Sequence, residues 1–227
     1  MKRLVNYFPA LFLTLVFIVW TILVKTIDMS YIDNVGYIGF SHFNFQVNNF
    51  VVEFVRIETF DKLSDIGLYL SFAVVLTFGV IGIVQWIKRK SIKKVDSILF
   101  ALLAIYVITV IEYFIFEIVK INYSPLSTAE ELHASYPSSH VLFFITFVMT
   151  GVLALFEYVK VHKAIKVATI SFAALVSLAY VVVRLLSGQH FFTDIVGGLF
   201  LSASIIALFI ALKLDFVKAE EVKELEE

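Results

Sequence analysis

The sequence predicts an all-α membrane protein, a bundle of six transmembrane helices. Of its 227 residues, 60% are hydrophobic and only 16% are charged, and a single soluble core does not need so many apolar side chains. Six apolar runs are each long enough to cross a hydrocarbon layer of roughly 30 Å at about 1.5 Å per helical residue. These runs cover residues 8–27, 66–87, 97–119, 141–159, 165–186 and 195–214.

The first run, 8–27, is expected to be a retained span. It is too long for the apolar core of a signal peptide, and no small-residue cleavage site follows it.

The segment that follows, 28–65, is expected to lie outside the bundle. Between Phe43 and Phe60, apolar residues recur at helical spacing against polar ones, which predicts a helix lying on the outer leaflet. A loop element packed over the bundle without a role in substrate entry is an equal alternative. The alternation from Phe43 to Val47 also leaves a short strand open.

The remaining features indicate one domain over residues 1–227. The chain has no internal repeat, low-complexity tract or linker. Residues 215–227 form a tail whose acidic end, from Glu220, is expected to be solvated and frayed.

The basic residues predict the orientation. With the N-terminus inside, 13 of the 18 Lys and Arg residues fall in cytoplasmic segments, as basic residues do in membrane proteins. We therefore expect a multi-pass protein of the plasma membrane with both termini in the cytoplasm. Residues 120–140 and 187–194 are then extracytoplasmic.

Composition also excludes several classes. The chain contains no cysteine, which excludes disulfides and thiolate metal sites. There is no glycine-rich phosphate loop, zinc-ligand set or serine hydrolase elbow. We expect no cofactor and no metal, and neither the net charge of −1 nor any motif implies a nucleic acid or protein partner.

A cation, an imidazole and a carboxylate stand at fixed intervals in the stretch that ends at residue 194. They are Arg184, His190 and Asp194. If the second half is helical, His190 and Asp194 share a face one turn apart. The carboxylate can then fix the histidine tautomer and free the other ring nitrogen to attack an electrophile. Arg184 offers the planar fork that suits phosphate oxygens.

A second polar cluster, Pro137-Ser138-Ser139-His140, precedes the fourth apolar run. Proline and serines begin helices well, so free backbone N–H groups and the positive helix end would form an anion site. His140, in the first turn, can protonate a leaving oxygen. Lys120 adds a positive charge at the end of the third run; an interface anchor that snorkels to headgroups is the alternative for this lysine.

Together, Lys120, the Pro-Ser-Ser-His cluster and the Arg-x5-His-x3-Asp stretch resemble the three-part signature of the type 2 phosphatidic acid phosphatase superfamily. The resemblance implies a six-helix fold with the site at its outer face. It implies that His190 is a nucleophile that forms a phosphohistidine, that Asp194 orients it, and that His140 is the acid. Phosphoryl oxygens would be bound by Lys120, Ser138, Ser139 and Arg184.

The chain departs from the family pattern in each motif. Ser139 replaces a glycine, and Val183 replaces a serine. Ser127 and Thr128 replace an Arg-Pro pair in the first motif, so one phosphate-binding cation is missing. Arg56 is predicted as the auxiliary cation, with an ordinary headgroup contact as the alternative.

The resemblance implies a lipid phosphatase that works at the extracytoplasmic face. Its substrate would be a phosphomonoester or diphosphate of a bilayer lipid, of the phosphatidic acid, phosphatidylglycerol phosphate or polyprenyl diphosphate type. Two alternatives remain open: a lipid phosphotransferase with the same site, and a degenerate, non-catalytic lipid-binding member.

Overall fold

The computed structural model describes residues 2–32, 35–55 and 57–226. Over these residues it is mainly helical. The helices are α1 (Lys2–Thr26), α2 (Ser41–Phe54), α3 (Ile57–Arg89), α4 (Ser97–Ile118), α5 (Ser139–Tyr158), α6 (Lys163–Leu186) and α7 (Phe192–Glu226), with one 3₁₀ turn, η1 (Ile92–Lys94). Two strands, β1 (Ser30–Ile32) and β2 (Gly36–Ile38), pair antiparallel.

The prediction of six membrane spans is confirmed. Within the described residues, every α-helix except α2 is long and apolar enough to cross a bilayer. The largest boundary difference is in α7, which continues to Glu226 and not to residue 214, so the tail predicted to be frayed is helical over the described residues. The next largest is in α3, which begins at Ile57 and not at residue 66. Its polar first turns are helical because an acidic residue near a helix N-terminus is favourable and Glu58 pairs with Lys62 one turn on, at 2.6 Å.

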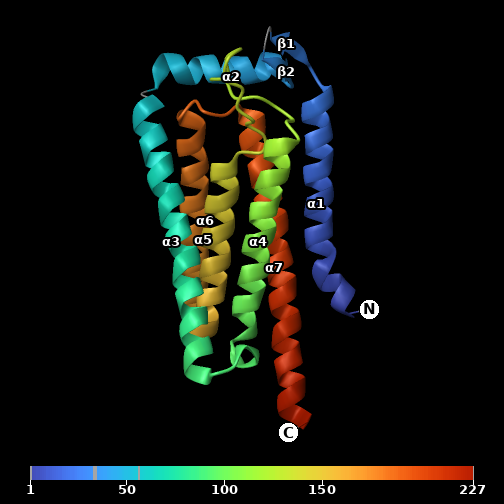
Figure 1. Ribbon diagram of the computed structural model, residues 1–227, viewed down its shortest axis with the longest axis vertical. Coiled ribbons are helices and arrows are strands. Elements are labelled where there is room, and N and C mark those ends of the chain that lie inside the picture. The colour runs from blue at the N-terminus through green and yellow to red at the C-terminus, as the bar shows by residue number, and fades with distance from the viewer. Residues whose placement is uncertain (1, 33–34, 56, 227) are drawn as a thin grey trace.

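The bundle is organised around α5. This helix packs against α3, α4, α6 and α7, while α1 lies along α7 (Figure 1). Large side chains at the centre are fully buried, including Phe147 of α5, Leu102 of α4 and Phe209 of α7. Burial on this scale is what fixes the helices relative to one another.

A cap lies across one end of the bundle, formed by α2 and the β1–β2 hairpin (Figure 1). The helix predicted over 43–60 is α2 in its first part, whereas Ile57 onward belongs to α3; the strand left open at 43–47 is helical. The apolar face of α2 is turned outward, with Phe50 and Phe54 exposed, and Asn44 is buried. The hairpin was not predicted from the sequence.

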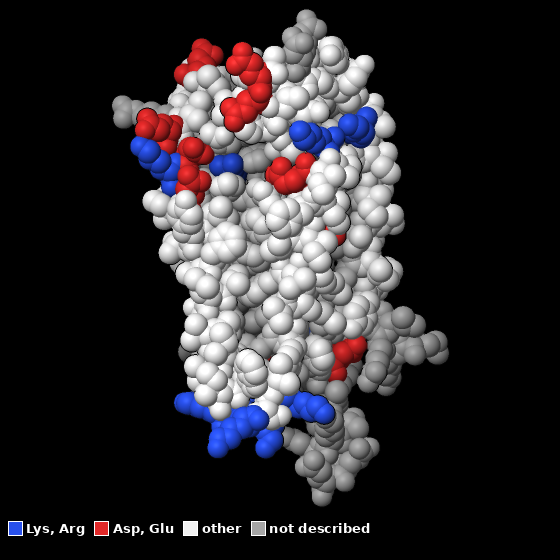
Figure 2. All heavy atoms as spheres, in the orientation of Figure 1, with Lys and Arg blue, Asp and Glu red and all other residues white. Residues whose placement is uncertain are grey.

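Charge is concentrated at the two ends of the molecule. On the face shown in Figure 2, basic side chains gather at the end opposite the cap, both signs occur at the capped end, and the belt between them carries few charges. This distribution is typical of a protein whose middle lies in hydrocarbon.

Candidate active site

The second and third sequence motifs meet at the capped end, where α5 and α7 begin. The backbone N–H of Ser138 donates to the carbonyl of Asp194 at 3.0 Å. The chains approach this closely because α7 presents glycines: a Cβ on Gly197 would lie 2.5 Å from the Tyr136 ring, and one on Gly198 would lie 3.0 Å from the Ser138 carbonyl. These glycines therefore hold the two motifs together.

His190 lies in the loop between α6 and α7, 8% exposed. Its Nδ1 is 2.9 Å from the carbonyl oxygen of Ser135. A carbonyl only accepts hydrogen bonds, so Nδ1 carries the proton and Nε2 keeps its lone pair. Burial, and then the neighbouring Arg184 and His140, lower the pKa of His190 well below its ordinary value. The imidazole is therefore neutral at neutral pH, and the three side chains lie within electrostatic reach of one another.

Asp194 is fully buried, but it makes other contacts than those expected from the sequence. Its Oδ1 accepts from Nδ2 of Asn122 at 2.9 Å, and its Oδ2 accepts from the backbone N–H of Phe191 at 3.1 Å. The expected bond to His190 rested on a shared helical face. Because α7 begins only at Phe192, His190 lies outside the helix and its ring turns to Ser135 instead.

Arg184 and His140 are both paired with α3. The Arg184 Nη1 donates to Asp61 Oδ1 at 3.3 Å and to Ser64 Oγ at 3.2 Å. The His140 Nε2 lies 3.2 Å from Asp65 Oδ1. Asp61 and Asp65 are four residues apart and so share one face of α3. This face brings two carboxylates to the basic groups of the site.

Among the site residues predicted from the sequence, three buried polar atoms have no hydrogen-bond partner in the described part of the chain. They are Ser138 Oγ, His140 Nδ1 and Arg184 Nε. Ser138 Oγ and Arg184 Nε can donate, and an unpaired buried donor costs about 1–3 kcal/mol. Because His140 Nε2 faces the Asp65 carboxylate, His140 Nδ1 donates only when the ring is protonated. An anion that accepts from all three would remove this cost, so the arrangement suits a phosphoryl group. Ser139 is half-buried and lines a small cavity beside His190.

The remaining predicted residues are not drawn into this cluster. Lys120 is exposed, and its Nζ lies 6.0 Å from the centre of the Tyr123 ring. Ser127, where the family has arginine, bonds to the backbone of His133. Arg56 lies outside the described residues.

The cap helix α2 and the membrane span α1 both bind the start of α7. Asn44 of α2 donates to Thr193 Oγ1 at 2.8 Å and accepts from its backbone N–H at 3.3 Å. Trp20 of α1 donates to the Thr193 carbonyl at 3.1 Å. These bonds fix the residue next to Asp194, so the cap contributes to the geometry of the site.

Five residues whose groups contact the site were not predicted from the sequence: Asp61, Ser64, Asp65, Asn122 and Ser135. The two aspartates carried a signal, because they stand four apart at the end of the segment predicted to be outside. Asn122 had no distinguishing pattern. Ser135 acts through its backbone carbonyl, which the sequence does not reveal. Among the described residues, no group of three or more His, Asp or Glu could hold a metal ion.

The fold and the site define a multi-pass membrane protein with a cluster of buried polar side chains, among them two histidines and an arginine, at one end of its bundle. Residues 114–218 match the sequence model of the PAP2 superfamily, a stretch that contains all three motifs, and this confirms the family resemblance. A similar solved structure is a transmembrane PAP2-type phosphatidylglycerolphosphate phosphatase from Bacillus subtilis. It is 16% identical with a TM-score of 0.61, over 92% of this chain and 96% of that one. At this identity the likeness shows the fold. No curated protein matches the chain.

Proposed function

We propose that this chain, as a single domain, is a membrane lipid phosphatase. The family match and the fold support a phosphatase that acts on a lipid in the bilayer. The substrate is a phosphomonoester or diphosphate of a membrane lipid, and the reaction passes through a phosphohistidine on His190.

One observation carries the proposal: a neutral, buried imidazole offers its Nε2 lone pair near two unpartnered donors and near His140, whose Nδ1 is a third donor when that ring is protonated. The Ser135 carbonyl holds the proton of His190 on Nδ1. Ser138 Oγ, His140 Nδ1 and Arg184 Nε are free to bind phosphoryl oxygens. Fixed donors stabilise the charge of a transferring phosphoryl group without reorganising.

In the first step, His190 Nε2 attacks phosphorus as the bond from phosphorus to the leaving oxygen breaks. His140 gives the leaving oxygen a proton from Nδ1, while its Nε2 faces Asp65. The Asp65 carboxylate stabilises the imidazolium form that this role requires. The second aspartate, Asp61, holds Arg184 in place until the phosphate arrives.

In the second step, water attacks the phosphorus of the phosphohistidine. His140 Nδ1 accepts the water proton, the N–P bond breaks, and inorganic phosphate leaves. His190 is then neutral again, with Nδ1 still bound to Ser135. Asp194 acts through Asn122 and Phe191, which position the loop that carries His190.

We further propose that the site is extracytoplasmic and both termini cytoplasmic, in the plasma membrane. The basic residues at the end opposite the cap support this orientation (Figure 2). Arg56 remains the proposed auxiliary cation. It directly precedes α3, the helix that carries Asp61 and Asp65.

The test measures whether the purified protein, in detergent, releases phosphate from three lipids. They are phosphatidic acid, phosphatidylglycerol phosphate and a polyprenyl diphosphate. We expect release from at least one lipid, and none from His190→Ala. The matched control is His162→Ala, because His162 is exposed at the far end of the bundle. Folded wild-type protein that releases nothing from any of the lipids contradicts the proposal.

The changed first motif favours a second candidate, a non-catalytic lipid-binding member. Ser127 cannot supply the charge of the family's arginine, and its hydroxyl is engaged by His133. In that case the same lipids bind to wild type and to His190→Ala alike, and neither releases phosphate.

A further inference from the structure

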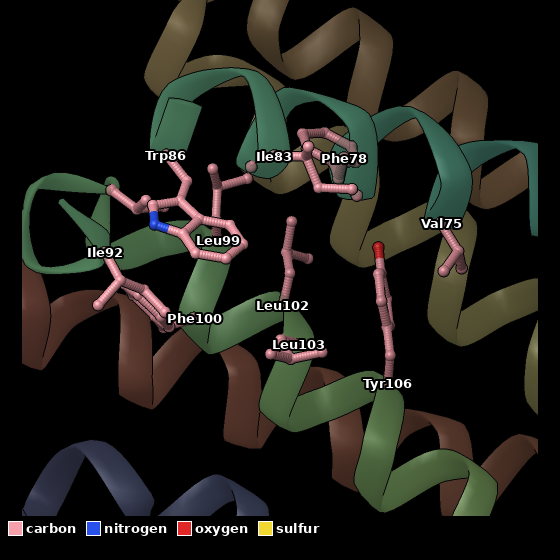
Figure 3. Close-up of a pocket in the computed structure, with 13 residues that line it drawn as sticks. Val75, Phe78, Ile83, Trp86, Ile92, Leu99, Phe100, Leu102, Leu103 and Tyr106 are labelled. Carbon is pink, nitrogen blue, oxygen red and sulfur yellow. The ribbon is translucent and has the colours of Figure 1, made fainter. Parts of the chain in front are cut away.

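A second feature lies in the other half of the bundle: an apolar groove between α3 and α4 with a volume of about 320 Å³ (Figure 3). Its size falls within the roughly 300–1,000 Å³ of small-molecule sites. None of its lining residues belongs to the candidate active site.

The groove exists because the two helices pack elsewhere. α3 packs mainly on α5 and α6, and α4 on α5 and α7. On the α3 side, Gly79 and Gly82 line the groove and have no side chain that would fill it. A Cβ on Gly79 would meet nothing within 4 Å. Buried Phe78, Leu99 and Leu102 form the floor.

The rim is exposed on the flank of the bundle. Trp86 is 52% exposed and Leu103 is 59% exposed, and both line the groove (Figure 3). This flank belongs to the apolar belt of the protein, so the material around it is lipid.

The length of the groove matches one leaflet. Along α3 it extends from Val75 to Trp86, which is roughly 16 Å at the helical rise per residue. Half of a hydrocarbon layer of about 30 Å has nearly the same depth. An acyl chain from one leaflet therefore fits the groove along its axis.

The mouth of the groove is basic. Ile92 and Val95 of the α3–α4 connection line it, and Lys93 and Lys94 between them are exposed. Lys88 and Lys90 are exposed at the end of α3, whereas Arg89 pairs with Asp96. The lysines are left at the level where a lipid headgroup would lie, and near a membrane surface each attracts anionic lipid.

We propose that this groove binds a phospholipid with an anionic headgroup. One acyl chain lies between α3 and α4, and the headgroup phosphate contacts Lys93 and Lys94. The site is separate from the candidate active site, at the opposite end of the bundle, and the lipid bound there is not hydrolysed.

Trp86 is a built-in reporter for this site, because bromine on an acyl chain quenches a tryptophan that it touches. The protein is placed in phosphatidylcholine vesicles in which a minor fraction of the lipid is brominated phosphatidylglycerol or, separately, brominated phosphatidylcholine. The chain has two tryptophans, so the signal of Trp86 is the difference between wild type and Trp86→Phe. We expect brominated phosphatidylglycerol to quench Trp86 more strongly at an equal fraction.

Two variants test the two halves of the site. Lys93→Gln with Lys94→Gln should reduce the preference for phosphatidylglycerol by a factor of about 5–30. Gly79→Leu should fill the groove and reduce quenching by both lipids, whereas the neighbouring control Val80→Leu, exposed and outside the groove, should not.

Two outcomes overturn the proposal. Equal quenching by both lipids means that the rim touches bulk lipid without selecting a headgroup. Absence of quenching by either means that protein, such as a second copy of the chain, covers the groove.

Discussion

The Nδ1–H of His190 is bonded to the backbone carbonyl of Ser135, so the loop before α5 fixes the tautomer of the candidate nucleophile. The carboxylate of Asp194 acts on His190 only through neighbouring residues. It binds Asn122 of the same loop and the N–H of Phe191 next to the histidine. The site therefore depends on the fit between two loops.

Exchanging the side chains of Asn122 and Asp194 tests this fit. Either single change, Asn122→Asp or Asp194→Asn, places two acceptors or two donors face to face. Each should lower the free energy of unfolding by about 1–3 kcal/mol and reduce turnover. In the double variant, the amide at position 194 can donate to the carboxylate at position 122 and still accept from the N–H of Phe191.

We expect the double variant to recover at least half of the lost stability, and turnover with it, measured by thermal unfolding and phosphate release. Asn49→Asp, exposed on α2, is the control and should change stability by less than about 0.5 kcal/mol. Recovery of stability without turnover would show that the Asp194 carboxylate has a direct catalytic part.

The lowered pKa of His190 predicts a pH dependence of stability. Above about pH 6.5, the imidazole is neutral in the folded and the unfolded chain, and its contribution is constant. As the pH falls below that value, the unfolded chain binds a proton at this histidine and the folded chain does not. Stability is then lost at up to about 1.4 kcal/mol per pH unit.

His190→Asn removes this titration while retaining a side-chain donor for Ser135. Wild type should therefore lose more stability than the variant between pH 6.5 and lower values, measured by unfolding in detergent. Parallel curves for the two proteins would show that His190 takes up a proton in the folded state.

Asp65 is predicted to act through His140. Asp65→Asn keeps the size of the side chain but removes the charge that stabilises the imidazolium. For a lipid phosphomonoester, whose alkoxide leaves poorly, kcat should fall roughly 10-fold or more, and His140→Ala should reduce it by about 10²–10⁴. A diphosphate needs less protonation of its leaving group and should be less affected.

The effect of Asp65→Asn should appear in kcat and leave KM nearly unchanged, because the pair assists a step after binding. Glu58→Gln is the control on the same helix, since Glu58 is exposed and pairs only weakly with Lys62 in solvent. Equal losses for both substrate types would indicate a structural role of Asp65.

The sequence predicted the six spans well because long apolar runs have few alternatives in a bilayer. It also identified His140, Arg184 and His190, which the structure brings together. It could not predict the partners: Asp61 and Asp65 lie outside the stretch that matches the family, and Ser135 contributes a backbone atom. The expected pair of His190 and Asp194 was wrong because it assumed a helix two residues longer than α7.

Topology is directly measurable, because the natural chain has no cysteine. Ser127→Cys should react with an impermeant maleimide added to intact cells, and Lys93→Cys should react only after the cells are opened. The reverse pattern would place the candidate site in the cytoplasm and contradict the orientation proposed from the basic residues.

The central claim is that His190 is phosphorylated during turnover, and the direct measurement is to trap that state. Enzyme mixed with a lipid carrying radioactive phosphate is quenched in alkali, where phosphohistidine survives, and the label is mapped by peptide analysis. The account predicts a label on His190 in wild type that acid removes, and none in His190→Ala. Phosphate release by His190→Ala at the wild-type rate, with no labelled histidine in either protein, would contradict it.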